Sequence, residues 1–251
     1  AKYHVGSYAF VNFPTLSIFQ WHPYTLSSGP HDEYIEFHIK SLGDHTQQLV
    51  EVAKQRSHLW CRVDGPYGRF RFDHRRYAYV MLCAGGVGVT PCIAALKDIF
   101  RIDMSDSKRK VVKNQNAAKI VHLVWSCAKA EHFLWFADVL EKCIAKKAKH
   151  SDAPRLIANV FFTRGVDEAK YPHLKKGADY NGIKIHHGRP VAETEMKTAG
   201  ERMRKKKIQC GLAIACGPSK LVSAFWDQSV HLTVDKDSGC AMMFHHETFD
   251  F

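Results

Sequence analysis

The sequence predicts two domains: a small antiparallel β-barrel, followed by an α/β domain built on a doubly wound parallel sheet. Up to about residue 74, short alternating strands are separated by Gly/Pro turns, which is typical of a small barrel or sandwich. From about residue 75, apolar strands alternate with helices, as they do when helices cover both faces of a parallel sheet. We therefore place the domain boundary between residues 74 and 75.

The first domain is predicted from short runs in which apolar and polar residues alternate. The strands are expected at residues 5–14, 21–28, 34–40 and 59–64, with a short helix over 47–54. Turn residues separate these elements, for example Gly29-Pro30 and Gly43-Asp44.

The second domain is predicted from nearly continuous apolar runs, which indicate strands buried on both faces. These strands are expected at residues 76–82, 120–125, 158–163, 184–187 and 211–216, with a last strand-like run at 242–246. One helix is expected to begin at residue 91 and a second to span 131–147. A third is expected to end at about residue 204, and a fourth to begin at residue 218.

The rest of the chain is arranged around the turn Cys-Ala-Gly-Gly-Val-Gly-Val-Thr-Pro at residues 83–91. Its three glycines allow the backbone to approach a ligand closely. Thr90 is expected as the N-cap of the next helix and Pro91 as its first residue. Such a strand, turn and helix place free backbone N–H groups at an anionic phosphate. A plain turn, with glycines for close packing, is the alternative.

Composition narrows the class of protein. With 45% hydrophobic and 24% charged residues, the 251-residue chain is a folded soluble protein. Its net charge of +11 suits an anionic membrane surface, an acidic partner or a cofactor. No nucleic-acid partner is predicted, because no nucleic-acid-binding motif accompanies the charge.

Eight cysteines without paired metal-ligand spacing indicate a reducing compartment and no metal site. No apolar run reaches the roughly 18 residues that span a bilayer.

Several short motifs occur in a fixed order along these predicted elements. They are His-Pro-Tyr-Thr at 22–25, His-Ile-Lys at 38–40, Gly-Asp-His-Thr at 43–46, Asp-Gly-Pro-Tyr-Gly at 64–68, the turn at 85–91, Gly-Arg-Pro at 188–190, Cys-Gly-Pro at 216–218 and the aromatic C-terminus at 251. In this order the chain resembles the ferredoxin–NADP reductase superfamily. Most closely it resembles the cytosolic dehydrogenase domain of the NADPH oxidase and ferric reductase family.

The resemblance implies an FAD-binding domain over residues 1–74. The FAD site would consist of His22, Pro23, Tyr24, Thr25, His38, Lys40, Thr46 and Phe251. Tyr24 would pack on the isoalloxazine ring and Thr25 would hydrogen-bond near N5. Lys40 and Thr46 would meet the pyrophosphate. A barrel-core tyrosine and an exposed strand-end lysine are the alternatives for Tyr24 and Lys40. Family members usually carry Trp where this chain has His45, and often Arg at Lys40.

The resemblance likewise implies an NAD(P)H-binding domain over residues 75–251. Its site would consist of Gly85, Gly86, Val87, Gly88, Thr90, Pro91, Cys127, Arg164, Arg189, Cys216, Gly217 and Pro218. Cys216 would lie near the nicotinamide without covalent chemistry; a plain buried cysteine is the alternative.

The preference for NADPH would depend on cations for its 2′-phosphate. Family members often place Arg after the aromatic-x-Cys of the second strand, where this chain has Ala128 and Lys129. Arg164 and Arg189 are the remaining candidates, with Lys129 as a substitute.

The C-terminal Phe251 would stack over the flavin face that receives the nicotinamide, and would move away before hydride transfer. The alternative is a frayed terminus. The resemblance thus places Thr25, Cys216 and Phe251 at the reacting atoms.

The function implied is transfer of a hydride from NADPH to FAD, then of single electrons to haem in a transmembrane domain absent from this chain. The final acceptor would be oxygen, giving superoxide or hydrogen peroxide, or ferric iron. The domain would work at the cytoplasmic face of a membrane, with an anionic lipid surface as a further partner. A soluble flavin reductase of the cytochrome b5 reductase type is one alternative. A regulatory nucleotide-binding module without turnover is another; Ala128 favours it, and the retention of Tyr24, Thr25 and Cys216 opposes it.

Overall fold

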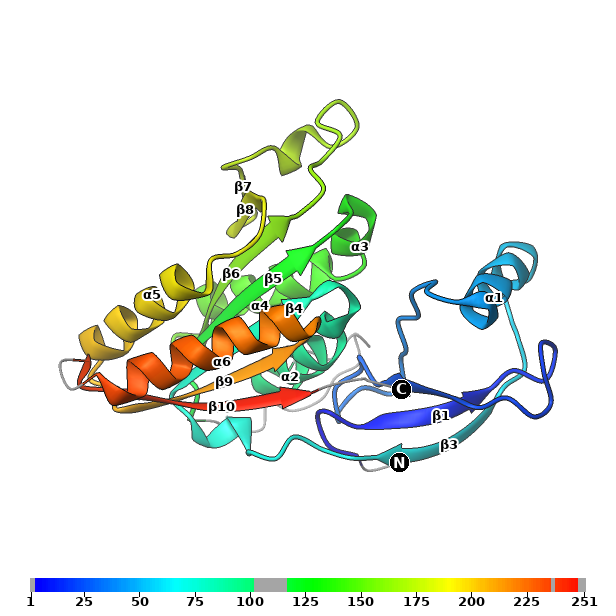
Figure 1. The fold of residues 1–251 in the computed structure, drawn as a ribbon, viewed down its shortest axis with the longest axis horizontal. Helices are drawn as coiled ribbons and strands as arrows, with labels where there is room; N and C mark the ends of the chain where they lie inside the picture. The colour runs from blue at the N-terminus through cyan, green and yellow to red at the C-terminus, as the bar shows by residue number, and fades with distance from the viewer. Residues whose placement is uncertain (1–2, 102–116, 236–237, 248–251) are drawn as a thin grey trace.

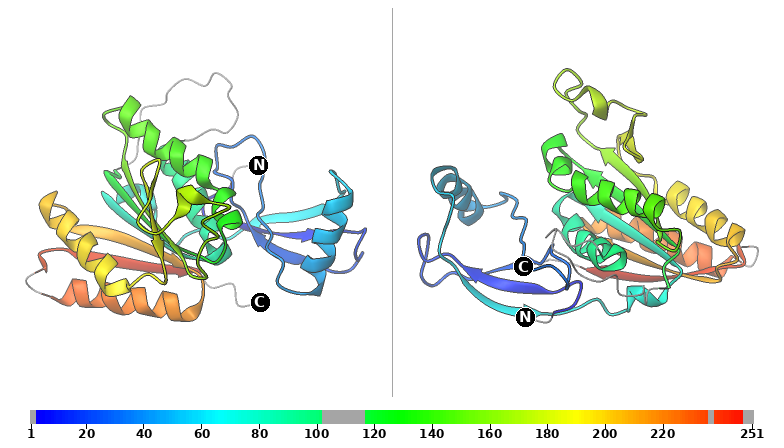
Figure 2. Two further views of the ribbon diagram at one scale, coloured as in Figure 1. Left: turned by 90° about the horizontal axis from the view of Figure 1, so that it is seen from above. Right: turned by 180° about the vertical axis from the view of Figure 1, so that it is seen from behind.

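The structure, a computed structural model, describes residues 3–101, 117–235 and 238–247. Its strands form a three-stranded sheet and a seven-stranded sheet, which lie beside each other in the views of Figures 1 and 2. The smaller sheet is antiparallel, whereas the larger one is parallel except at one edge. The predicted fold class, an antiparallel β-barrel followed by a doubly wound α/β domain, is confirmed, and in the described residues the first domain contains a three-stranded antiparallel sheet.

The smaller sheet has the order β2-β1-β3. Its elements are β1 (Tyr8–Asn12), β2 (His22–Thr25) and β3 (Arg62–Tyr67), with helix α1 (Asp44–Gln55) between β2 and β3. The strand predicted at residues 34–40 is wrong, because this segment makes only the single bridge Leu26–Phe37.

Strand β3 also differs from the prediction, because it continues through Gly65-Pro66 to Tyr67 instead of ending at Asp64. Gly65 makes this possible: a Cβ at that position would lie 2.9 Å from Cβ of Ala9 in the neighbouring strand. The missing side chain lets the two strands pair closely.

The larger sheet has the order β10-β9-β4-β5-β6-β8-β7, and only β7 and β8 pair antiparallel. Its strands are β4 (Tyr79–Gly85), β5 (Ile120–Cys127), β6 (Arg155–Phe162), β7 (Asp179–Tyr180), β8 (Ile183–His187), β9 (Cys210–Cys216) and β10 (Ala241–Glu247). The helices are α2 (Thr90–Phe100), α3 (Ala130–Leu134), α4 (Ala137–Lys149), α5 (Ala192–Lys205) and α6 (Ser219–Val234), with short 3-10 turns η1 (His74–Arg76), η2 (Gly86–Val89) and η3 (Pro172–Leu174).

The helix predicted over 131–147 is in fact two helices, α3 and α4, with Trp135 and Phe136 between them. Both Phe133 and Phe136 are buried, and their rings lie 6.2 and 5.9 Å from that of Trp125. The two helices thus place both phenylalanine rings in one aromatic cluster around Trp125.

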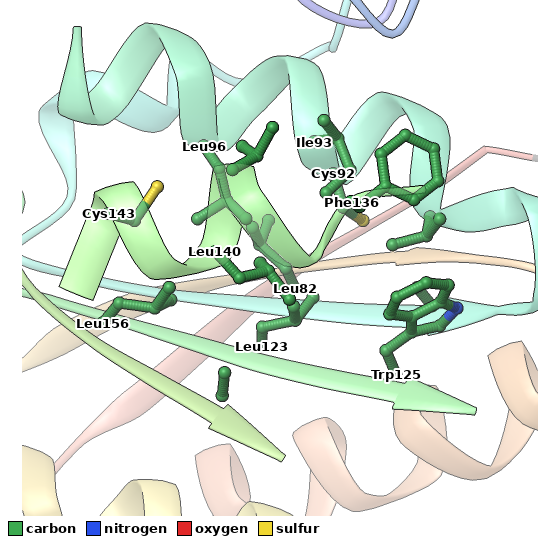
Figure 3. Packing of buried hydrophobic residues seen from close by; sticks show 14 of the residues in the cluster. Leu82, Cys92, Ile93, Leu96, Leu123, Trp125, Phe136, Leu140, Cys143 and Leu156 are labelled. Atoms are coloured by element: carbon green, nitrogen blue, oxygen red, sulfur yellow. The ribbon is translucent and has the colours of Figure 1, made fainter. Parts of the chain in front are cut away.

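The helices cover both faces of the parallel sheet, α2 to α4 on one side and α5 and α6 on the other (Figure 2). Figure 3 shows the first of these cores, in which side chains of α2 and α4 pack on Leu82, Leu123 and Trp125. All seven residues of β4 are buried, and alternate ones belong to opposite cores. The continuous apolar run that predicted this strand is thus explained.

Two buried charges of α2 join the two parts of the chain. Lys97 is only 3% exposed and pairs with Asp32, at 3.1 Å, and with Glu36. Beside it, the Asp98 carboxylate contacts Nε2 of His31 at 3.1 Å and Nε2 of His74 at 2.9 Å. These ion pairs hold the segment predicted as a strand against α2, which explains why it does not join the small sheet.

All eight cysteines are free. Burial raises the pKa of the Cys83, Cys92 and Cys143 thiols, so these side chains act as small core residues. Over the described residues, no helix combines the length and the apolar character needed to cross a membrane.

Candidate functional site

The glycine turn begins where β4 ends, at the carboxyl edge of the parallel sheet. The 3-10 turn η2 leads directly into α2, so that Val89, not Thr90, is the N-cap residue. Thr90 has helical backbone angles and its hydroxyl donates to the Val87 carbonyl at 3.0 Å. The predicted capping role of Thr90 is therefore wrong, and Pro91 is the second residue of the helix, one position later than predicted.

The glycine turn packs directly on the Cys-Gly-Pro turn, because β4 and β9 are parallel neighbours with Ala84 opposite Cys216. A Cβ on Gly88 would lie 2.5 Å from the Cys216 carbonyl oxygen. A Cβ on Gly217 would lie 2.8 Å from Cα of Gly85. Only glycine fits these contacts. The structure thus brings together the two motifs that the sequence predicts for the nicotinamide nucleotide.

Trp125, at the end of β5, also supports the turn. Its indole Nε1 donates to the Gly86 carbonyl at 3.0 Å. The sequence did not predict this role: Trp125 ends the strand predicted at 120–125, but only the structure pairs that strand with β4. Two residues further on, the thiol of Cys127 donates to the Lys129 carbonyl at 3.1 Å. Burial raises the pKa of Cys127 to about 11, so it is a neutral donor.

Cys216 is fully buried, and burial raises the pKa of its thiol. It is therefore protonated at neutral pH, which fits a packing role beside a ligand better than covalent chemistry. Strand β10 places Glu247 opposite Cys216, and the Glu247 carboxylate lies 2.7 Å from Nε2 of His245. This acidic residue was not among the sequence candidates.

Arg164 and Arg189 follow the carboxyl ends of β6 and β8, which are paired neighbours. Both side chains are exposed. Neither guanidinium has a hydrogen bond or ion pair to the part of the chain that the structure describes. Both are thus free to meet an anion at the same edge of the sheet as the glycine turn.

In and beside the small sheet, buried polar atoms without partners among the described residues include Nε2 of His22 and the hydroxyl of Tyr24 in β2, Oδ1 of Asn12 in β1, and Nε2 of His45 in α1. Burial raises the pKa of the Tyr24 hydroxyl. The rings of His22 and His45 stack with centroids 3.8 Å apart. Buried polar groups are normally hydrogen-bonded, so their gathering here indicates a place for a ligand with polar edges. An aromatic strand with unpaired donors fits FAD.

The other residues predicted for FAD are distributed over this sheet and its border with the α/β domain. Pro23 and Thr25 lie in β2, with Thr25 opposite Tyr8. The Thr46 hydroxyl accepts from the backbone N–H of Gly43 at 3.1 Å and fixes the start of α1. Phe251 lies outside the described residues.

Two further FAD candidates lie where the small sheet meets α3 and the glycine turn. Nδ1 of His38 is 2.7 Å from the Ser27 hydroxyl, and its ring lies 4.3 Å from that of Phe136. Lys40 lines a small cavity together with Gly86 and Val87. Lys40 of the first domain thereby lies beside the predicted phosphate turn.

The chain was compared with families of known proteins. Residues 1–71 match the model of an FAD-binding domain family, and residues 77–230 match that of the ferric reductase NAD-binding domain. The predicted boundary between residues 74 and 75 stays a prediction.

Relatives include NADPH oxidase 1 of Mus musculus, 29% identical over 255 residues that cover 98% of this chain and 41% of that protein. NADPH oxidase 3 of Homo sapiens is 30% identical, covering 97% of this chain and 44% of that one. Respiratory burst oxidase homolog protein B of Solanum tuberosum is 28% identical, covering 99% and 32%. The chain thus spans less than half the length of these relatives.

Solved structures with the same fold include a ferredoxin NADP+ reductase from Neisseria gonorrhoeae with bound FAD and NADP. It has a TM-score of 0.58 and 15% identity, covering 98% of this chain and 87% of that one. The ferredoxin reductase in carbazole 1,9a-dioxygenase has a TM-score of 0.60 and 15% identity, covering 99% and 61%.

Proposed function

This chain belongs to the family of the ferric reductase NAD-binding domain, and we propose that it transfers a hydride from NADPH to FAD. The observation that carries the proposal is the junction at the glycine turn. There, Lys40 of the first domain and Gly86 and Val87 of the second line one cavity. Residues predicted for two different cofactors therefore meet at the carboxyl edge of the sheet, where ligands of open α/β folds bind.

On the nicotinamide side, the backbone N–H groups of η2 and the start of α2 would hold the diphosphate of NADPH. Arg164 and Arg189 would bind the 2′-phosphate as charge-assisted donors. The close packing of Gly88 and Gly217 supports this role, because it brings the Cys216 turn against the phosphate turn. Cys216, neutral and buried, would exclude water from the nicotinamide.

On the flavin side, Tyr24 would offer its ring to the isoalloxazine and its unpaired hydroxyl to a polar edge. Thr25 in the same strand would lie near N5, and Lys40 would neutralise phosphate charge. FAD, when bound, supplies the chemistry that accepts a hydride and releases electrons one at a time. Phe251 would cover the flavin face until NADPH arrives.

We further propose that the electrons leave to haem in a transmembrane domain of the same full-length protein. The names and lengths of the NADPH oxidase relatives support this, since they extend well beyond the region that this chain matches. Oxygen or ferric iron would be the final acceptor. The domain would then lie at the cytoplasmic face of a membrane, where its net charge of +11 favours anionic lipid.

Stopped-flow absorbance tests the proposal. The protein, loaded with FAD under anaerobic conditions, is mixed with NADPH or with NADH. We expect the flavin band near ~450 nm to bleach, and to bleach faster with low NADPH than with equal NADH. Equal rates of bleaching with NADPH and with NADH would mean that Arg164 and Arg189 do not bind the 2′-phosphate. FAD that stays bound but does not bleach would overturn the hydride-transfer function and favour a binding module without turnover.

A further inference from the structure

The end of the small sheet that lies far from the α/β domain exposes a group of large apolar side chains. The loop between β1 and β2 and the segment that leads from α1 into β3 lie side by side there (Figures 1 and 2), since Asn12 and Arg62 are paired residues of β1 and β3 at this end. Four exposed side chains form what we call the apolar tip: Ile18, Phe19, Trp21 and Trp60. Phe19 is 84% exposed and Trp60 is 65% exposed, so the fold itself does not cover these rings.

The loop that carries most of the apolar tip is held in shape by one buried side chain. Nδ2 of Asn12 donates to the carbonyls of Ser17 and Gln20, at 2.7 Å each. Asn12 is fully buried, and the two carbonyls lie on either side of Ile18 and Phe19. The hydrogen bonds therefore keep these two apolar side chains at the surface of the folded chain.

The charges beside the apolar tip are all of one sign. Residues 13–21, the loop between the strands, carry no charged side chain. Residues 52–63, the segment beside this loop, carry Lys54, Arg56 and Arg62 but no acidic residue. Apolar rings bordered by cations are typical of a surface that lies on anionic lipid, with the rings among the headgroups and the cations at the phosphates.

Two of these three cations are available to an external anion. Lys54 pairs with Glu51 at 2.6 Å. Neither Arg56 nor Arg62 makes an ion pair with the part of the chain that the structure describes. The Arg62 guanidinium lies 5.3 Å from the centroid of the Trp60 ring, so a cation and a ring of the tip are already held together.

We propose that the apolar tip inserts into the headgroup region of an anionic bilayer, with Arg56 and Arg62 at the lipid phosphates. This rests on the proposed location at a membrane and assigns a surface to it. Tryptophan rings favour this region, because their faces leave water while the indole N–H still finds a partner. Charge favours lipid over a second copy of this chain, since two chains of net charge +11 repel each other.

Insertion of the apolar tip would bring the proposed flavin strand to the membrane. Trp21 directly precedes His22, the first residue of β2. At the usual rise of a strand, Thr25 lies roughly 13 Å along the chain from Trp21. The tip would thus hold β2 next to the bilayer, on the side where the proposed electron transfer to haem takes place.

The first test is co-sedimentation of the FAD-loaded protein with phosphatidylcholine vesicles that contain either no phosphatidylserine or about 30% of it. We expect binding to the anionic vesicles alone, weakened by salt. Phe19→Ser should weaken this binding about three- to tenfold, and Arg56→Gln about fivefold. Val234→Ser, an exposed apolar residue of α6, and Arg155→Gln, an exposed cation of β6, are the matched controls and should bind as the unchanged protein does.

A second test locates the inserted side chains. Lipids brominated in their acyl chains quench the fluorescence of tryptophans that enter the bilayer. We expect the unchanged protein to be quenched on anionic vesicles. The variant Trp21→Phe/Trp60→Phe should bind with similar affinity and lose most of the quenching, although it keeps Trp125, Trp135 and Trp226.

Three results would overturn the inference: no binding to anionic vesicles, equal binding by the unchanged protein and Phe19→Ser, or quenching that persists without Trp21 and Trp60. A dimer in solution that Phe19→Ser dissociates would also overturn it, because the tip would then belong to an interface between copies. Thermal melts show whether each variant is folded. Flavin bleaching is measured without vesicles, so its absence would overturn the hydride transfer and leave this surface standing.

Discussion

The backbones of Gly85 and Gly217 lie in contact, so close that a Cβ on Gly217 would come within 2.8 Å of both N and Cα of Gly85. Gly85 ends β4 and Gly217 directly follows β9, the neighbouring strand, at the carboxyl edge of the sheet. The contact sets the distance between the glycine turn and the Cys-Gly-Pro turn. A substitution that adds a side chain to one of these turns is therefore expected to displace the other turn as well.

Gly88→Ala should separate the two turns. The new Cβ would lie 2.5 Å from the Cys216 carbonyl oxygen, and backbone cannot move away as easily as a side chain. We expect a loss of about 1–3 kcal/mol in the free energy of unfolding, with weaker NADPH binding. Gly43→Ala is the control, since nothing lies within 4 Å of its Cβ. Thermal melts and NADPH titrations check both, and an unchanged Gly88→Ala variant would contradict the close packing.

Tyr24→Phe removes a buried hydroxyl that has no partner among the described residues. Without FAD, the variant should be as stable as the unchanged protein or more stable by up to about 1 kcal/mol. With FAD, we expect a Kd raised about three- to tenfold, because the polar edge of the bound flavin loses the Tyr24 hydroxyl as its donor. Chemical denaturation measures the stability without FAD, and flavin fluorescence measures the Kd for FAD. The reverse pattern, a less stable protein with unchanged affinity, would show that the hydroxyl serves the fold alone.

Lys97→Ala should destabilise the protein strongly, because it leaves Asp32 buried without a counter-ion. Removing one partner of a buried pair costs about 3–5 kcal/mol. The exposed pair Lys54–Glu51 provides the comparison: Lys54→Ala should change the free energy of unfolding by less than about 1 kcal/mol. Urea unfolding measures both. Equal effects would mean that the Lys97 contacts do not hold the segment at Asp32 on α2.

Acid should weaken the buried network around His122. Arg202 can only donate, so Nδ1 of His122 accepts from it, at 3.5 Å, and the protonated Nε2 donates to Glu195 at 3.2 Å. Burial lowers the pKa of His122. For Glu195, burial acts to raise the pKa, but the hydrogen bond from His122 and its charge lower it overall.

Both groups thus bind fewer protons in the folded chain than in the unfolded one. Stability should therefore fall as pH drops below the usual histidine value of 6.5, and further near the usual glutamate value of 4.5. Glu195→Ala should cost about 2–3 kcal/mol at neutral pH, whereas Glu193→Ala, exposed on the same helix, should cost little. Thermal melts across this pH range check the direction; a midpoint that rises with acid would refute the neutral His122.

Replacing Arg164 and Arg189 together by alanine should weaken NADPH binding about 10- to 100-fold and leave NADH binding unchanged, because only NADPH carries the 2′-phosphate. Arg155→Ala, at the opposite end of β6, is the matched control. Titrations with NADPH and with NADH give the two Kd values that test this prediction. A parallel loss for both nucleotides would place the two arginines at the diphosphate instead.

The strands and helices of the α/β domain could be predicted because local composition fixes them. In a run such as Tyr79–Gly85, neither set of alternate residues is polar, so neither face can be exposed to water. Such a run is typical of a strand with a hydrophobic core on each face. The glycines of the turn at 83–91 were predicted to let the backbone approach a ligand, with close packing as the alternative; the contact of Gly85 with Gly217 was not predicted. Residues 34–40 alternate as well as any true strand. Residues 34–40 do not form a strand because Lys97 and Asp98, far along the chain, bind the residues that directly precede this segment.

The sequence by itself determined the class of fold, the order of the two domains and the motifs proposed to bind nucleotides, since alternation, glycine turns and motif order are properties of neighbouring residues. Only the tertiary structure decided which distant side chains share an environment. It stacked His22 on His45, set Trp125 on the glycine turn and opposed Glu247 to Cys216. These contacts depend on strand order and register, which join residues far apart in the chain and leave no trace in local patterns.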